Sequence, residues 1–193
     1  MVKTIRFDDY PSFRPNLTPY EMFELGSFGG TYWRPIKSKF YKRELRNQHH
    51  EFSWSKRLSD DVMTRSCADY DKTINKYGVK VGGYRVDDKC GLLTWTRNGW
   101  IHKQDPYGWV QWYARFYDGR RSPDDEWQIE RWAGIAGPLG RFRLRLIGMI
   151  MDEDAKYNDY EISPAIRQVL QHWGYQLTLA DYRAGVKHIE STD

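Results

Sequence analysis

The sequence has little cysteine and no long apolar run. Only Cys67 and Cys90 occur among its 193 residues, and no stretch approaches the roughly 18 apolar residues that a membrane-spanning helix needs. The first residues, MVKTIRFDDYPSF, lack the apolar core of a secretion signal. We therefore expect a protein of the cytoplasm, or of the nucleus in a eukaryotic cell, with free thiols and no membrane partner.

Sequence motifs for metals and nucleotides are also missing. The glycine-rich stretches lack the GK[ST] ending of a Walker loop and do not fit a dinucleotide fingerprint. His49-His50-Glu51 is the nearest approach to a metal motif, but adjacent histidines rarely reach one ion from a regular element, and no HExxH or CxxC spacing supports them. We expect no cofactor and no bound metal.

Aromatic residues are abundant, and the charge is mildly basic. The chain has 9 Trp, 14 Tyr and 8 Phe, with a formal net charge of +4. Aromatic side chains serve cores and stacking surfaces equally well, and a basic balance favours a polyanionic partner. The length suits one domain with a full core.

The fold expected from these patterns is mainly α (α+β), a single domain over residues 1–193. Residues 1–90 are expected to be irregular, with a short helix over 18–26 and another over 59–77. Asn98-Gly99 lies between two strand-like runs, which predicts a small β-hairpin over 91–104. A four-helix array is expected over 105–180.

The array is predicted from repeated helix punctuation. A cap residue followed by proline opens three of its helices: Asp105-Pro106, Ser122-Pro123 and Ser163-Pro164. Gly119 and Gly174 are expected to end helices. The helical spacing of Trp109, Trp112 and Phe116 predicts that they are core, whereas Gln111 and Arg115 lie off that stripe and are expected to face solvent or a ligand.

A basic segment rich in aromatics lies between Arg34 and Arg57. It holds eight Lys or Arg residues against Glu44 and Glu51, a local charge of +6, with four aromatics interleaved and Trp33 directly before it. Nucleic-acid surfaces combine cations for phosphates with flat rings for unstacked bases, although a solvated basic face is the alternative. The expected nucleic-acid-binding residues are Lys37, Lys39, Lys42, Arg43 and Arg46, together with Arg120 and Arg121 between two predicted helices.

The stretch ELGSFGGTYWRP, residues 24–35, is the first choice for a pocket. Its glycines let the backbone approach a ligand closely, and its aromatics can wall a base. The expected pocket residues are Phe28, Gly29, Gly30, Tyr32, Trp33 and Arg34. A tight turn ahead of a strand explains the same residues.

Asp124, Asp125 and Glu126 follow Ser122-Pro123 directly. Carboxylates in a first helical turn favour the positive end of the helix dipole, by ~0.3–1 kcal/mol each, so a helix start is the favoured interpretation. A catalytic role for Asp124 or Asp125 stays open.

The run GWIHKQDPYGWVQWYARFYDGRRSPDDEWQIERW resembles a signature of a family of hypothetical proteins, GWI followed by DPxGWxxWYxRxYxGRRxxDDxxQIxRW. With the upstream ELGSFGGTYW and the downstream SPAIRQVLQHWGY, the likeness spans most of residues 19–175. It implies a shared fold and carries over no catalytic residue.

Two functions are weighed ahead of a weaker third, a metal-dependent nuclease that uses the acidic run at residues 124–126. The first is a nucleic-acid-binding protein, with DNA the favoured partner, that in an enzymatic version hydrolyses a flipped or modified base as a DNA glycosylase does, using Asp124 or Asp125 to position water. The alternative is a non-enzymatic assembly module with an aromatic and arginine-rich surface. The sequence leaves the oligomeric state open.

Overall fold

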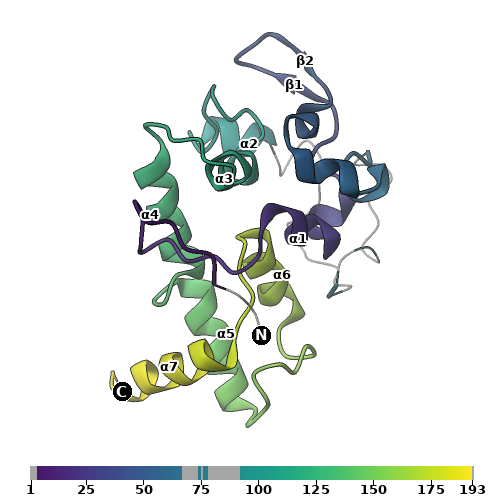
Figure 1. Ribbon diagram of the computed structural model, residues 1–193. Helices are drawn as coiled ribbons and strands as arrows, with labels where there is room; N and C mark the ends of the chain where they lie inside the picture. Colours follow the sequence, from purple (N-terminus) through teal and green to yellow (C-terminus); the bar gives the residue numbers. More distant parts are fainter. Residues whose placement is uncertain (1–3, 67–73, 75, 78–91, 193) are drawn as a thin grey trace. The chain divides into compact units, whose positions relative to one another are not determined.

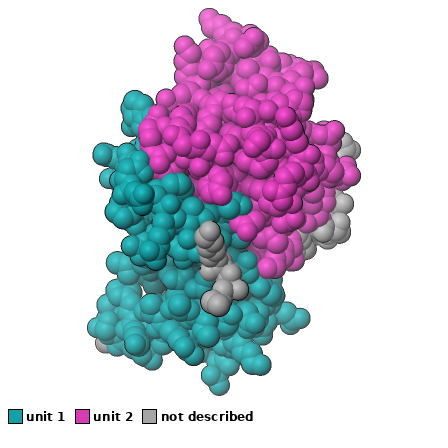
Figure 2. Space-filling view, viewed as in Figure 1, with its two compact units in different colours: residues 1–18, 122–193 teal, residues 19–121 magenta. Residues whose placement is uncertain are grey.

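The computed structural model describes residues 4–66, 74, 76–77 and 92–192. The chain divides into two compact units, residues 1–18 with 122–193 and residues 19–121 (Figure 2). Helices dominate, as expected for a mainly α protein, with one two-stranded antiparallel sheet (Figure 1). Within the described ranges, no helix is long and apolar enough to cross a membrane. The single domain stays a prediction, and Cys67 and Cys90 lie outside the described residues.

The unit of residues 1–18 and 122–193 is helical. Its elements are α4 (Asp125–Ala136), α5 (Arg141–Asp152), α6 (Pro164–His172) and α7 (Leu179–Glu190), with α5 packed against the other three. The N-terminal segment is tied to the end of α6, because Asn16 exchanges two 2.8 Å hydrogen bonds with the backbone of Gln176. Phe13 packs edge-on against Trp132 at 5.1 Å. This irregular segment is therefore part of the core.

The unit of residues 19–121 is built on aromatic side chains. Its elements among the described residues are α1 (Pro19–Glu24), the 3-10 helices η1 (Ser27–Gly30), η2 (Gln48–Glu51), η3 (Ser53–Arg57) and η4 (Asp60–Val62), strands β1 (Ile36–Ser38) and β2 (Arg43–Leu45), and helices α2 (Leu92–Arg97) and α3 (Trp109–Tyr117). Phe23 and Phe52 stack on Trp54, at 5.9 and 5.1 Å. Trp112 and Phe116 are fully buried on α3 and Trp109 nearly so, which confirms the predicted core stripe.

Glycine ends several helices as expected. The amide of Arg120 bonds Arg115 O at 2.9 Å and that of Gly119 bonds Phe116 O at 3.0 Å, while Gly119 takes a φ of 98°. This is a Schellman motif, in which a left-handed residue satisfies the last helical carbonyls. Gly174 ends α6 with the same pair of bonds.

The predicted hairpin over 91–104 is wrong, since residues 92–97 form α2. Trp100 N bonds Trp95 O, Gly99 N bonds Thr96 O, and Gly99 has a φ of 69°. Asn98-Gly99 is therefore a helix end, where one residue has positive φ, and not a hairpin turn, which needs two. The hairpin of this protein lies at residues 36–45.

Two other predicted helix positions need correction. The described part of 59–77 contains only η4. The backbone after η4 instead forms hydrogen bonds with the glycine-rich segment, from Arg65 N to Gly30 O and from Trp33 N to Met63 O, both at 2.8 Å. The helix expected from Pro106 begins at Trp109, because Gly108 has a φ of 85° and a ψ of −148°. The C-terminal helix α7, opened by Thr178 accepting from Asp181 N, was not expected.

Candidate nucleic-acid interface

A buried polar relay holds the hairpin on α3. The Tyr32 hydroxyl donates to Tyr107 O at 2.6 Å and accepts from Gln111 N at 3.1 Å, while Tyr107 N donates to Gln111 Oε1 at 3.0 Å. The Tyr107 hydroxyl then lies 2.9 Å from Arg34 O, before β1, and 3.3 Å from Leu45 O, at the end of β2, so both contacts are at the open end of the hairpin. Burial raises the pKa of Tyr32 and of Tyr107, so both hydroxyls stay protonated donors.

The hairpin itself is short and precisely registered. Ile36 pairs with Leu45, Lys37 with Glu44 and Ser38 with Arg43. Ile36 and Leu45 point into the core, and residues 39–42 form the connecting loop. The hairpin projects from the rest of its unit (Figure 1). Its surface positions therefore face solvent.

Most of the predicted nucleic-acid-binding cations lie on this hairpin. We define the basic hairpin as residues 36–46. Its five cations are all exposed: Lys37, Lys39, Lys42, Arg43 and Arg46. Glu44 pairs with Arg46 at 2.7 Å. Within the described ranges, no carboxylate pairs with the other four, so the loop end carries unbalanced positive charge.

Two aromatic rings at the loop are exposed beside these cations. Phe40 and Tyr41 are 37% and 40% exposed. The Tyr41 hydroxyl donates to Lys103 O at 3.0 Å, and Lys103 Nζ lies 6.0 Å from the centre of the ring. Lys103, which is exposed, thus adds a cation that the sequence could not assign to this surface.

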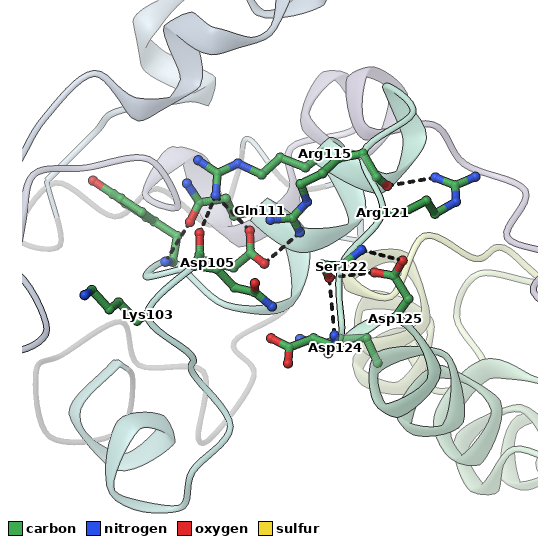
Figure 3. Close-up of polar contacts among 12 residues, drawn as sticks. Lys103, Asp105, Gln111, Arg115, Arg121, Ser122, Asp124 and Asp125 are labelled. Atoms are coloured by element: carbon green, nitrogen blue, oxygen red, sulfur yellow. Dashed lines mark hydrogen bonds and ion pairs between the residues drawn. The ribbon is translucent and has the colours of Figure 1, made fainter.

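Arg120 and Arg121 are engaged elsewhere in the same unit. Asp105, only 2% exposed, accepts from Arg120 at 2.7 Å and from Arg115 at 2.9 Å (Figure 3). Arg115 also forms a two-point pair with Glu51, at 2.8 Å for each bond. Arg121 lies 3.9 Å from the centre of the Phe116 ring and donates to the carbonyl of Phe116. These contacts balance the charge of Arg115 and Arg120 internally.

The predicted pocket residues pack as a turn ahead of β1. Tyr32 and Trp33 are buried, with Trp33 5.3 Å from Tyr107 between ring centres. A Cβ on Gly30 would lie 2.0 Å from Asp61 O, so this backbone is in close contact with η4. Phe28 lies 4.8 Å from the Tyr32 ring, Gly29 is buried, and Arg34 donates to Thr31 O. The turn interpretation accounts for these contacts, and a pocket stays a prediction.

Asp125 is used at the start of α4. Its carboxylate accepts from the amide and the hydroxyl of Ser122, at 2.9 and 2.8 Å, and the Ser122 hydroxyl lies 3.3 Å from Asp124 N (Figure 3). This arrangement is similar to a capping box with aspartate in place of glutamate, but Ser122 lies two residues before Asp124, the N-cap of α4. Asp125 is almost fully buried, whereas Asp124 is half-buried.

Gln111 was expected to face solvent or a ligand and is instead fully buried. Its side-chain oxygen accepts from Tyr107 N at 3.0 Å, whereas its side-chain nitrogen is buried without a hydrogen-bond partner among the described residues. The sequence placed Gln111 off the aromatic stripe of α3 and gave no signal for this relay.

Comparisons of the chain with protein-family models, with curated proteins and with solved structures found no match. The likeness to a family of hypothetical proteins therefore stays a resemblance.

Proposed function

We propose that the protein binds nucleic acid through the basic hairpin, with DNA as the favoured partner. The observation that carries this proposal is the exposure of five cations and two aromatic rings on one anchored hairpin. Cations that have no carboxylate partner can neutralise phosphates and release counterions, which drives binding and makes it dependent on salt. Lys103 extends the same surface.

The test is a charge reversal with a matched control. Lys42→Glu/Arg43→Glu changes the net charge by −4, and so does Arg183→Glu/Lys187→Glu on the exposed face of α7. Fluorescence anisotropy with labelled single-stranded and duplex oligonucleotides, over a range of salt concentrations, gives the affinity and its salt slope. We expect the hairpin variant to lose binding and to have a slope smaller by about 1.4–1.8, because two phosphate contacts are removed. Equal affinities of the two variants would overturn the proposal.

An enzymatic version of this function is a base-directed hydrolase of the DNA glycosylase type. It needs a carboxylate that can position water. Since Asp125 is buried and bonded to Ser122, we assign this role to Asp124, the more accessible of the two. Excision of modified bases that survives Asp124→Asn unchanged would rule out this version.

A further inference from the structure

The loop at residues 39–42 has two features that phosphate binding alone does not require. Phe40 and Tyr41 are adjacent, large and more than one-third exposed, although Lys39 and Lys42 on either side would suffice for phosphates. Exposing both rings to water has a cost, since each leaves apolar surface unburied. This cost indicates a use for the rings themselves.

We propose that these two rings stack on unpaired bases, so that the basic hairpin takes single-stranded nucleic acid in preference to intact duplex. This inference rests on the proposed function and names its substrate class. In a duplex, base faces are covered by their neighbours and only base edges reach the grooves. In a single strand the faces are accessible, and aromatic side chains beside cations bind them with little dependence on sequence.

The loop holds Tyr41 in place before any ligand binds. The Tyr41 hydroxyl donates to Lys103 O at 3.0 Å, and its backbone amide lies 3.4 Å from Ser38 Oγ. Lys42 takes a left-handed φ of 52°, which returns the chain to β2 with Arg43 opposite Ser38. A ring that is already oriented loses less conformational freedom on binding, so Tyr41 is suited to serve as a fixed stacking platform next to Phe40.

The charges are placed for a strand that passes over these rings. Lys39 and Lys42 flank the rings along the chain, Arg43 follows, and Lys103 lies at the Tyr41 ring. Among the described residues none of these four pairs with a carboxylate. Cations on both sides of the rings allow phosphates to be bound while the intervening bases stack. Charge complementarity therefore favours nucleic acid over a protein partner at this loop.

The experiment compares Phe40→Ala and Tyr41→Ala with Lys42→Glu/Arg43→Glu. The probes are a labelled oligothymidylate and a blunt duplex of the same length at one salt concentration. We expect each alanine variant to weaken single-strand binding about 5- to 150-fold, the range for loss of one stacked base. Duplex affinity should stay within about twofold, because the phosphate contacts remain. The charge reversal should weaken both complexes.

Two further variants separate stacking from folding. Tyr41→Phe keeps the ring and removes only its bond to Lys103 O, so it should retain more single-strand affinity than Tyr41→Ala. A single 2-aminopurine in the oligonucleotide reports stacking, and its fluorescence should be quenched by wild type and not by a Phe40→Ala/Tyr41→Ala double variant whose circular dichroism is native.

The outcomes distinguish the two proposals. If the charge reversal leaves both complexes intact, the proposed function fails. If the charge reversal weakens binding while the alanine variants affect single strand and duplex alike, or neither, the stacking inference fails and nucleic-acid binding stands. If the alanine variants instead abolish salt-insensitive self-association and leave the oligonucleotides bound, the loop is a protein interface and the inference is overturned.

Discussion

Replacing Asp105 with asparagine tests the charge network that supports the loop between α2 and α3. Asp105 is 2% exposed and accepts one bond from Arg115 and one from Arg120, whose side chains are 20% and 27% exposed. Removing one partner of a fully buried pair costs about 3–5 kcal/mol. The cost is smaller here because both arginines are partly exposed and Arg115 keeps its contact with Glu51. Asparagine also keeps one acceptor oxygen. We therefore expect a loss of about 2–3 kcal/mol.

The assay is thermal and urea unfolding followed by tryptophan fluorescence. For a chain of this length the loss corresponds to a fall in Tm of about 5–10 °C. Asp118→Asn is the control, because it removes the same charge from an exposed site in the same unit. Partial desolvation and the charge of Glu51 raise the pKa of Asp118, so its ionised form is disfavoured in the fold and the neutral variant should be as stable as wild type or more so. A loss below about 1 kcal/mol for Asp105→Asn, or an equal loss for Asp118→Asn, would refute the conclusion that the buried Asp105 network contributes more stability than the exposed carboxylate.

Two further predictions concern buried positions. Burial lowers the pKa of His172 to about 3, whereas an unfolded histidine titrates near 6.5. The unfolded state thus binds more protons between these values, and stability should fall by about 2 kcal/mol from pH 7 to pH 5 through this residue. The free energy of unfolding, measured in urea at pH 7 and at pH 5, should change less between the two pH values for His172→Gln than for wild type. An unchanged difference would contradict the assignment of this pH dependence to His172. Gly30→Ala should cost more than about 3 kcal/mol, because its Cβ would lie 2.0 Å from Asp61 O at a φ of 80°. Gly99→Ala has a similar φ and open space, so chemical denaturation should find a cost of only about 1–2 kcal/mol there, and equal costs would show that the contact with η4 is unimportant.

Local signals predicted the helix ends well. Gly119 and Gly174 end α3 and α6 because a left-handed residue at that point satisfies the last carbonyls, which depends only on neighbours in sequence. Because such signals depend only on neighbours in sequence, they also explain the wrong prediction of a hairpin turn at Asn98-Gly99. A glycine with positive φ serves a helix end and a hairpin turn alike, and the choice depends on whether the preceding residues form a helix.

The actual hairpin gave no such signal. Its loop, KFYK, contains no glycine or asparagine, and Lys42 takes the left-handed conformation that those residues usually supply. Its strands have three residues each, so alternation is too short to detect. The gathering of its cations could be predicted because they are contiguous, whereas the pairing of Arg120 with Asp105 and the placement of Lys103 depend on tertiary contacts.

The charge of the basic hairpin also gives a reason for the polar groups in the buried relay of Tyr32, Tyr107 and Gln111. Two strands of three residues are marginal in water, and five cations within residues 36–46 repel one another with only Glu44 between them. Burial of Ile36 and Leu45 opposes this repulsion, and the Tyr107 hydroxyl reaches one carbonyl beside each strand at the open end of the hairpin, Arg34 O and Leu45 O. An apolar residue at position 107 would pack equally well but would leave those carbonyls without this donor. The polar relay therefore helps to anchor this short hairpin while its cations and its two rings stay exposed to water.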